Sequence, residues 1–189
     1  MIHQHPFSSL TPSAQKKAFA LLTFFTLVVM RALTMLGAPL RTEHAPLGIV
    51  SFEFAKTLPQ AQRMIESWGE TGQLYATFNL GLDYLFLVLY PSSIALGCAL
   101  ISESLIHKQR LLSGTGLVLS WAQFGAGGLD AVENAALIKV LFGSQQPVWP
   151  ELAWWCALIK FAIVLTGLVY VMVGTVHILM TKFLKGWNS

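Results

Sequence analysis

Four apolar segments, each long enough to cross a lipid bilayer, make up most of this chain. They lie at approximately residues 18–40, 73–101, 111–142 and 152–180. A helix needs roughly 20 apolar residues to cross the hydrocarbon core, because it rises only about 1.5 Å per residue. Only 11% of the 189 residues are charged, against about 25% in an average soluble domain. The sequence therefore predicts an all-α, polytopic membrane protein, with residues 1–189 forming a single domain, a four-transmembrane-helix bundle.

The longest connection between these segments, the outer loop at residues 41–72, carries a helix pattern of its own. Thr57 can cap a helix that ends at Gly69. Its apolar side chains recur at helical spacing on one face, which predicts an amphipathic helix lying on the membrane surface. The preceding residues 49–55 are apolar apart from a serine and Glu53, so this stretch can dip into the bilayer. The apolar face of the helix consists of Leu58, Ala61, Ile65 and Trp68.

Lys and Arg residues in the short flanks of the segments predict the orientation in the membrane. Basic residues gather on the side that holds both termini, whereas the turn at residues 143–150 on the other side has none. Because cytoplasmic flanks carry an excess of Lys and Arg, we expect both termini in the cytoplasm and the protein in the inner (plasma) membrane. The basic side carries Lys16, Lys17, Lys108, Arg110, Lys182 and Lys185.

Five charged residues interrupt the four segments at about the same depth. In chain order they are Arg31, Asp83, Asp130, Glu133 and Lys160. At about 1.5 Å per residue, each lies about 12–18 Å from the outer end of its segment. A charge at the centre of a span costs about 2.5–3.5 kcal/mol even on the lenient insertion scale. We therefore expect these side chains to face one another in a buried polar layer in the outer half of the bilayer.

Uncharged polar residues accompany the charges at helical spacing. Asn79 precedes Asp83 by one turn, and Asn134 follows Asp130 by one turn. Residues three or four apart share one face of a helix, so these amides should point into the same layer. Glu53, in the outer loop, can approach that layer from above.

The five charges do not balance, since two are positive and three are negative. If each cation pairs with one acid, a third carboxylate is left to be protonated, to bind a cation or to meet a cationic ligand. We take Asp130 and Glu133 as candidate acid–base residues. The candidate ligand-binding residues are Arg31, Asp83, Asn79, Asn134, Lys160 and Glu53.

Three functions fit such a layer, and the sequence leaves open which is correct and whether the chain is an enzyme. The first is a pocket that binds or acts on a lipid-like or amphipathic small molecule, with Arg31 or Lys160 holding an anionic group. The second is a proton-coupled transporter component, which would need a homodimer because four spans are few. The third is an accessory or structural subunit of a membrane complex, whose charges lock its helices together as an ion-pair network or dock a membrane-protein partner.

Other ligand classes are not expected. No basic run with interleaved aromatic residues marks a nucleic-acid surface, despite the net charge of +3. No HxxE or ExxH pattern favours a metal, and two cations compete for the acids of the layer. His177 lacks a second intramembrane histidine with which to hold a haem. The sequence therefore predicts the lipid bilayer as a partner, and neither metal, cofactor nor nucleic acid.

Three short motifs resemble a group of uncharacterised bacterial four-span membrane proteins. They are Phe52-Glu53-Phe54-Ala55, Gly81-Leu82-Asp83 and Leu129-Asp130-Ala131-Val132-Glu133-Asn134. The resemblance covers most of the chain, and it implies fold and location without an activity. It singles out as candidate site residues Glu53, Asp83, Asp130, Glu133 and Asn134.

Overall fold

Helices make up 85% of the protein, and no strand occurs in the part of the chain that the structure describes. The structure is a computed structural model, and it describes residues 4–105 and 109–187. Lys108 therefore lies outside the described residues, as do the side chains of Lys182 and Lys185. The all-α prediction is confirmed. In chain order the elements are α1 (Pro12–Gly37), the 3-10 turn η1 (Ala38–Leu40), α2 (Ile49–Glu53), α3 (Leu58–Leu105), α4 (Arg110–Leu141) and α5 (Val148–Trp187).

Three described helical stretches are long and apolar enough to cross a membrane. They are Pro12–Leu40, Leu58–Leu105 and Val148–Thr181, which contain the first, second and fourth predicted spans. Helix α4 coincides with the third predicted span and has 32 residues. It is not among these three stretches, so its place as a span stays a prediction.

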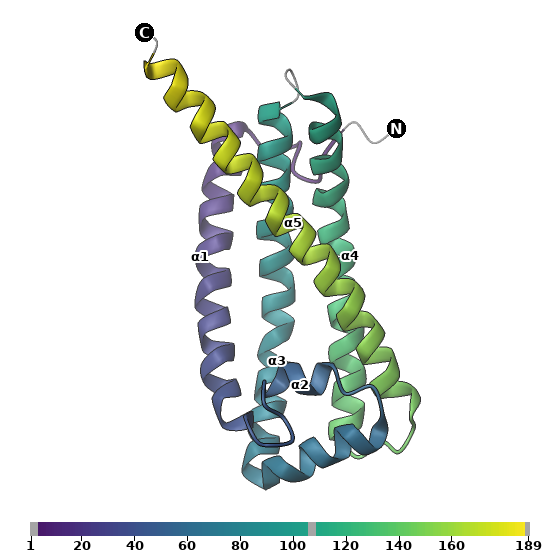
Figure 1. Ribbon diagram of the computed structural model, residues 1–189. Coiled ribbons are helices and arrows are strands. Elements are labelled where there is room, and N and C mark those ends of the chain that lie inside the picture. Colours follow the sequence, from purple (N-terminus) through teal and green to yellow (C-terminus); the bar gives the residue numbers. More distant parts are fainter. Residues whose placement is uncertain (1–3, 106–108, 188–189) are drawn as a thin grey trace.

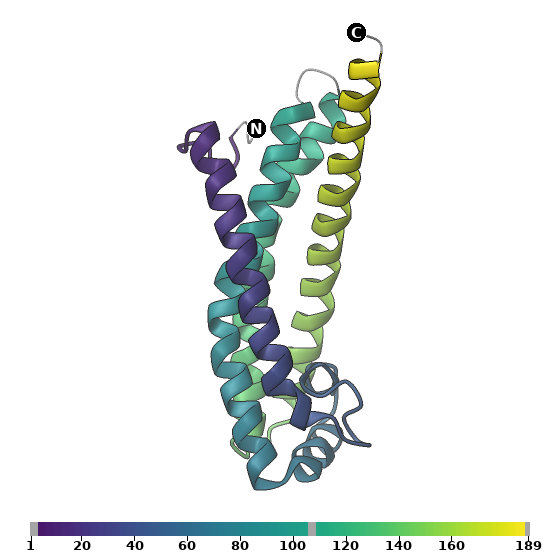
Figure 2. The same ribbon diagram turned by 90° about the vertical axis from the view of Figure 1, so that its left-hand side faces the viewer.

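Helices α3 and α4 run side by side and pack against each other, and α5 crosses both obliquely (Figures 1 and 2). Close approach of α3 and α4 depends on glycine. A Cβ at Gly127 of α4 would lie 3.1 Å from the Leu87 carbonyl oxygen and 3.1 Å from the Pro91 ring of α3. The first residues of α1 and the last residues of α5 lie at the same end of the molecule (Figure 1).

Helix α1 packs against α3 through one face. The Asn79 side chain of α3 donates a hydrogen bond of 2.9 Å to the Leu33 carbonyl oxygen, and the hydroxyls of Thr23 and Ser93 lie 2.8 Å apart. Most of the other faces of α1 are exposed. Because only one face of α1 packs against α3, the position of Arg31 around the helix determines whether its charge is buried or exposed.

The end of the molecule opposite the termini is closed by α2 and by the first part of α3 (Figure 1). Helix α3 turns at Gly69, whose φ of 60° and ψ of −175° interrupt the helix after Trp68. The Trp68 indole donates a hydrogen bond of 2.8 Å to the Leu40 carbonyl oxygen, and its ring packs edge-on against Phe52, with centroids 5.2 Å apart. The predicted apolar face of the Leu58–Trp68 stretch therefore packs on an apolar core of this protein.

Candidate functional site

Lys160 of α5 lies among carboxylates from two other helices. Its Nζ lies 2.8 Å from Oδ1 of Asp130 and 2.8 Å from Oε2 of Glu133, one turn apart on α4. Glu53, the last residue of α2, places its Oε2 3.9 Å from the same nitrogen. The exposed fractions are 6% for Lys160, 3% for Asp130 and 0% for Glu133. We call Lys160, Asp130, Glu133 and Glu53 the Lys160 cluster.

Two residues of α3 extend the Lys160 cluster. The Tyr90 hydroxyl donates a hydrogen bond of 2.9 Å to Oδ2 of Asp130. Asp83 is half-buried, accepts a hydrogen bond of 2.6 Å from the Asn134 amide, and is close enough to interact electrostatically with Asp130. Tyr90 was not predicted from the sequence. Its position seven residues after Asp83, two turns along the same face, was the signal that could have identified it.

Asn79 and Arg31 do not join the cluster, contrary to expectation. Asn79 uses its amide to hold α1, through the Leu33 carbonyl oxygen. Arg31 is exposed and has neither a hydrogen bond nor an ion pair with any residue that the structure describes. The residue rise gives the depth of Arg31 along α1, but the rotation of α1 is set by the face that packs on α3. That face includes Val29 and Leu33, and Arg31 lies two residues from each, on the opposite side.

The cluster holds buried carboxylate oxygens that lack hydrogen-bond donors. Glu133 pairs with Lys160 by charge, but neither of its oxygens has a well-aligned hydrogen bond within the described residues. The Oε2 atom of Glu53 is also buried without a hydrogen bond from the described residues. Buried polar atoms almost always have a partner, so such oxygens call for a proton, a water molecule or a ligand.

Glu53 lies outside the long helices, and its surroundings favour the protonated form. Burial raises the pKa of the Glu53 carboxyl from 4.5 to about 7, although the positive charge of Lys160 acts to lower it. The negative charges of Asp83 and Asp130 act in the same direction as burial. Glu53 can therefore take up or release a proton near neutral pH.

Aromatic contacts hold Glu53 over Lys160. We call residues 49–56 the clasp, because side chains that follow Glu53 attach this segment to α5. Phe54 stacks on Phe161 of α5. The Lys56 ammonium lies 4.5 Å from the centroid of the Trp154 ring, also on α5. The clasp is thus anchored by contacts that do not involve the carboxylate itself.

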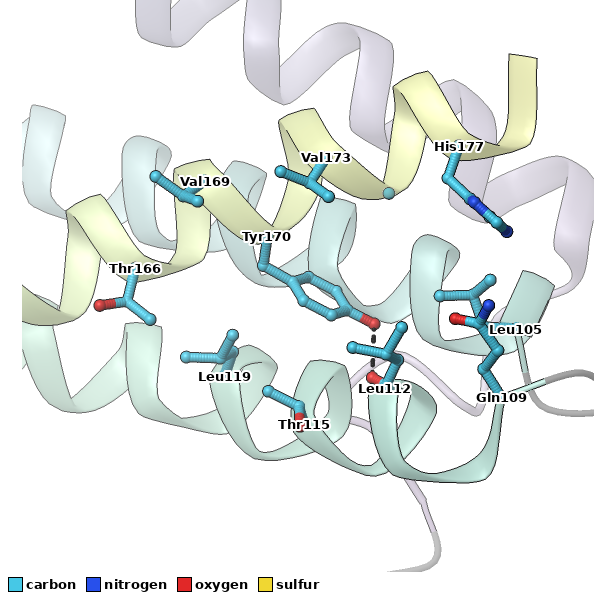
Figure 3. Close-up of a pocket in the computed structure, with 11 residues that line it drawn as sticks. Leu105, Gln109, Leu112, Thr115, Leu119, Thr166, Val169, Tyr170, Val173 and His177 are labelled. Atoms are coloured by element: carbon cyan, nitrogen blue, oxygen red, sulfur yellow. Dashed lines mark hydrogen bonds between the residues drawn. The ribbon is translucent and has the colours of Figure 1, made fainter. Parts of the chain in front are cut away.

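An apolar pocket of about 320 Å³ lies between α4 and α5, toward the termini (Figure 3). Leu112 and Leu119 line it from α4, and Val169 and Val173 line it from α5. The Tyr170 hydroxyl crosses the pocket to donate a hydrogen bond of 2.9 Å to the Leu112 carbonyl oxygen, drawn as a dashed line. None of the predicted site residues lines this pocket. Its surface suits a hydrocarbon chain, and none of its lining residues is an Asp, Glu, Lys or Arg.

Comparisons of the chain with protein-family models, with curated proteins and with solved structures find no match. The resemblance of the three motifs to bacterial four-span proteins therefore stays a prediction.

Proposed function

We propose that this chain is a four-helix integral membrane protein, with α4 as the remaining span. Helix α4 packs against both α3 and α5, so much of its polar surface faces protein instead of lipid. The Leu58–Trp68 stretch would lie at the outer membrane surface. Lys16 and Lys17 are exposed at the end of the molecule that holds the termini, which supports cytoplasmic termini in a plasma membrane.

In this protein the Lys160 cluster would bind a small amphipathic molecule that carries a positive charge. The observation that supports this function is the excess of acid around one cation. Glu53, Asp83, Asp130 and Glu133 gather near Lys160, so full ionisation would leave three uncompensated negative charges. Excess charge in an apolar medium is strongly unfavourable, so protons or a bound cation must neutralise it.

An anionic ligand fits the site less well than a cationic one. The anion-binding hypothesis relied on Arg31 and Lys160. Arg31 lies away from the cluster, and Lys160 is already engaged by Asp130 and Glu133. An anion would therefore have to displace a carboxylate, whereas a cation would meet oxygens that have no donor.

Binding of a cation would be coupled to the release of protons. Glu53 has an unpartnered oxygen and a pKa of about 7, so it would lose its proton as the cation enters, and the oxygens of Glu133 would also face the cation. The clasp covers the cluster from the outer end, so the ligand would enter beside Glu53. The apolar body of the ligand would then rest among the surrounding helices, in contact with lipid.

Binding of the lipophilic cation tetraphenylphosphonium to purified protein in lipid nanodiscs tests this proposal. Affinity should fall at least tenfold between pH 8 and pH 6, and the anion tetraphenylborate should bind no more than to empty nanodiscs. Glu53→Gln and Glu133→Gln should each weaken binding at pH 8 at least tenfold. Glu66→Gln, in the same outer loop but exposed, is the matched control and should bind normally. Equal affinity for the cation in all three variants would refute the proposal.

A structural lock is the second candidate, and the near-complete burial of Asp130 and Glu133 favours it. Here the cluster would join α2, α4 and α5 and bind nothing. In that case Asp130→Asn or Glu133→Gln should prevent accumulation of folded protein in the membrane. Folded variants that have lost cation binding would instead support the binding site. Proton-coupled transport would add one observation, a proton flux into liposomes that requires the cation.

A further inference from the structure

Arg31 lies on an exposed and largely apolar face of α1, where the hydroxyl of Thr34 is bonded to its own helix backbone. Its neighbours on that side include Leu27, Val28 and Met35, which are 53%, 49% and 61% exposed. The guanidinium has no hydrogen bond or ion pair with the described residues. The same helix is one of the stretches apolar enough to cross a membrane. A single charge is therefore presented to the surroundings of α1 from within a candidate span.

Packing of α1 prevents this charge from being satisfied within the chain. Val29 and Leu33 face α3, and a residue two positions away lies about 200° around the helix. Arg31 thus points away from Asp83, although the hydrogen bond between Asn79 and Leu33 places the two residues at similar depths. Arg31 also lies nine residues before the end of η1, roughly 14 Å from it along the axis.

Charged residues within spans almost always face a protein interior or pair with another charge. We propose that the Arg31 face of α1 is a docking surface for a transmembrane helix of a partner protein, which carries an Asp or Glu at the depth of Arg31. Arginine suits this role because its planar fork donates two parallel hydrogen bonds to one carboxylate. The surrounding exposed Leu, Val and Met side chains would pack against the same partner helix.

A second copy of this chain is a poorer partner for Arg31. The acidic side chains of this chain at the depth of Arg31 already have partners. Asp130 and Glu133 are buried in the Lys160 cluster, and Asp83 is half-buried and accepts a hydrogen bond from Asn134. None of the three offers a free carboxylate on an exposed face. Charge complementarity therefore favours a different protein with an acidic membrane helix.

Photo-crosslinking in native membranes tests this inference on the full chain. A photoreactive residue at Met35, beside Arg31, should give a protein adduct, and one at Leu179, on the exposed face of α5, should not. Arg31→Leu should reduce the Met35 adduct at least tenfold. Mass spectrometry should place the adduct on a membrane helix with an Asp or Glu, and exchanging the two charges between the partners should restore it.

Other outcomes would overturn the inference. Adducts to lipid alone would mean that Arg31 meets headgroups, and adducts to a second copy would mean a homodimer. A partner helix without an acid would also overturn it. Since Arg31 has no hydrogen bond or ion pair with the described residues, Arg31→Leu should leave thermal unfolding and tetraphenylphosphonium binding of the purified chain unchanged, which separates this inference from the proposed function. Arg31→Lys keeps the charge and should retain part of the adduct.

Discussion

The ring of Phe54 is stacked on the ring of Phe161, with centroids 5.7 Å apart and planes 21° from parallel. Phe54 follows Glu53 in the chain, and Phe161 follows Lys160. One apolar contact therefore holds the two charged neighbours next to each other. The Lys160 ammonium also lies 4.8 Å from the centroid of the Phe161 ring. The stack thus positions the clasp on α5 independently of the protonation of Glu53.

Removing the stack should loosen the clasp. An aromatic pair contributes about 0.5–1.5 kcal/mol beyond the area it buries, so Phe54→Ala should speed amide hydrogen exchange in residues 49–55 by up to about tenfold. Exchange within α4 should not change. Phe142→Ala is the control, because that ring is 72% exposed at the end of α4. Unchanged exchange in residues 49–55 would show that the stack does not hold the clasp.

Removing the cation of the cluster should destabilise the protein. Lys160→Met leaves Asp130 and Glu133 buried without their partner, which costs about 3–5 kcal/mol of unfolding free energy. Reversible unfolding in mixed micelles measures the loss, and the added change Glu133→Gln should recover part of it. Lys139→Met, which removes an exposed lysine of α4, should change little. Equal stability of the two lysine variants would contradict the ion-pair assignment.

The hydroxyl of Tyr90 should contribute more to the free energy of unfolding than that of Tyr84. Tyr90→Phe removes the hydrogen bond to Asp130 and should cost about 1.5–3 kcal/mol, the usual range for a bond to a charged group. Tyr84 donates at 3.3 Å to the Ala131 carbonyl oxygen and is 39% exposed, so Tyr84→Phe should cost about 1 kcal/mol or less. Unfolding of both variants in the same micelles checks the order, and the reverse order would refute it.

Stability should fall as pH rises through the titration of Glu53. Its pKa in the folded protein, about 7, lies above its ordinary value of 4.5. Between these values the folded state holds a proton that the unfolded state has lost, so raising the pH favours unfolding. The groups that face this carboxyl are Lys160, Asp83, Asp130 and Glu133.

Unfolding midpoints measured between pH 4.5 and pH 7 test whether stability falls as the pH rises. Glu53→Gln should remove much of the change of the unfolding midpoint with pH. Glu66→Gln should leave this pH dependence in place, since Glu66 is exposed. A wild-type midpoint that rises over this interval would contradict the expected burial of Glu53.

The depth of the charged residues along their helices could be calculated from the sequence. The constant rise of an α-helix places Asp83, Asp130, Glu133 and Lys160 at one level once the ends of the apolar segments are known. The structure brings these four residues together. Glu53 was also expected to approach from the loop, because the stretch around it is apolar.

Rotation and local contacts could not be calculated in the same way. Periodicity shows which residues of a helix share a face, but not which face meets another helix. For α1, the contacts with Asn79 and Ser93 set the rotation of the helix about its axis, and this rotation places Arg31 on the exposed side. Tyr90 reaches Asp130 only because α3 and α4 approach closely at Gly127.

Residue spacing along a single helix is enough to predict the helical class and the depth of the charged residues. The contacts between helices explain why Lys160 is surrounded by excess acid while Arg31 is left outside. Side-chain packing between helices fixes their relative rotation, and a rotation of half a turn moves a charge from the interior to the exposed face.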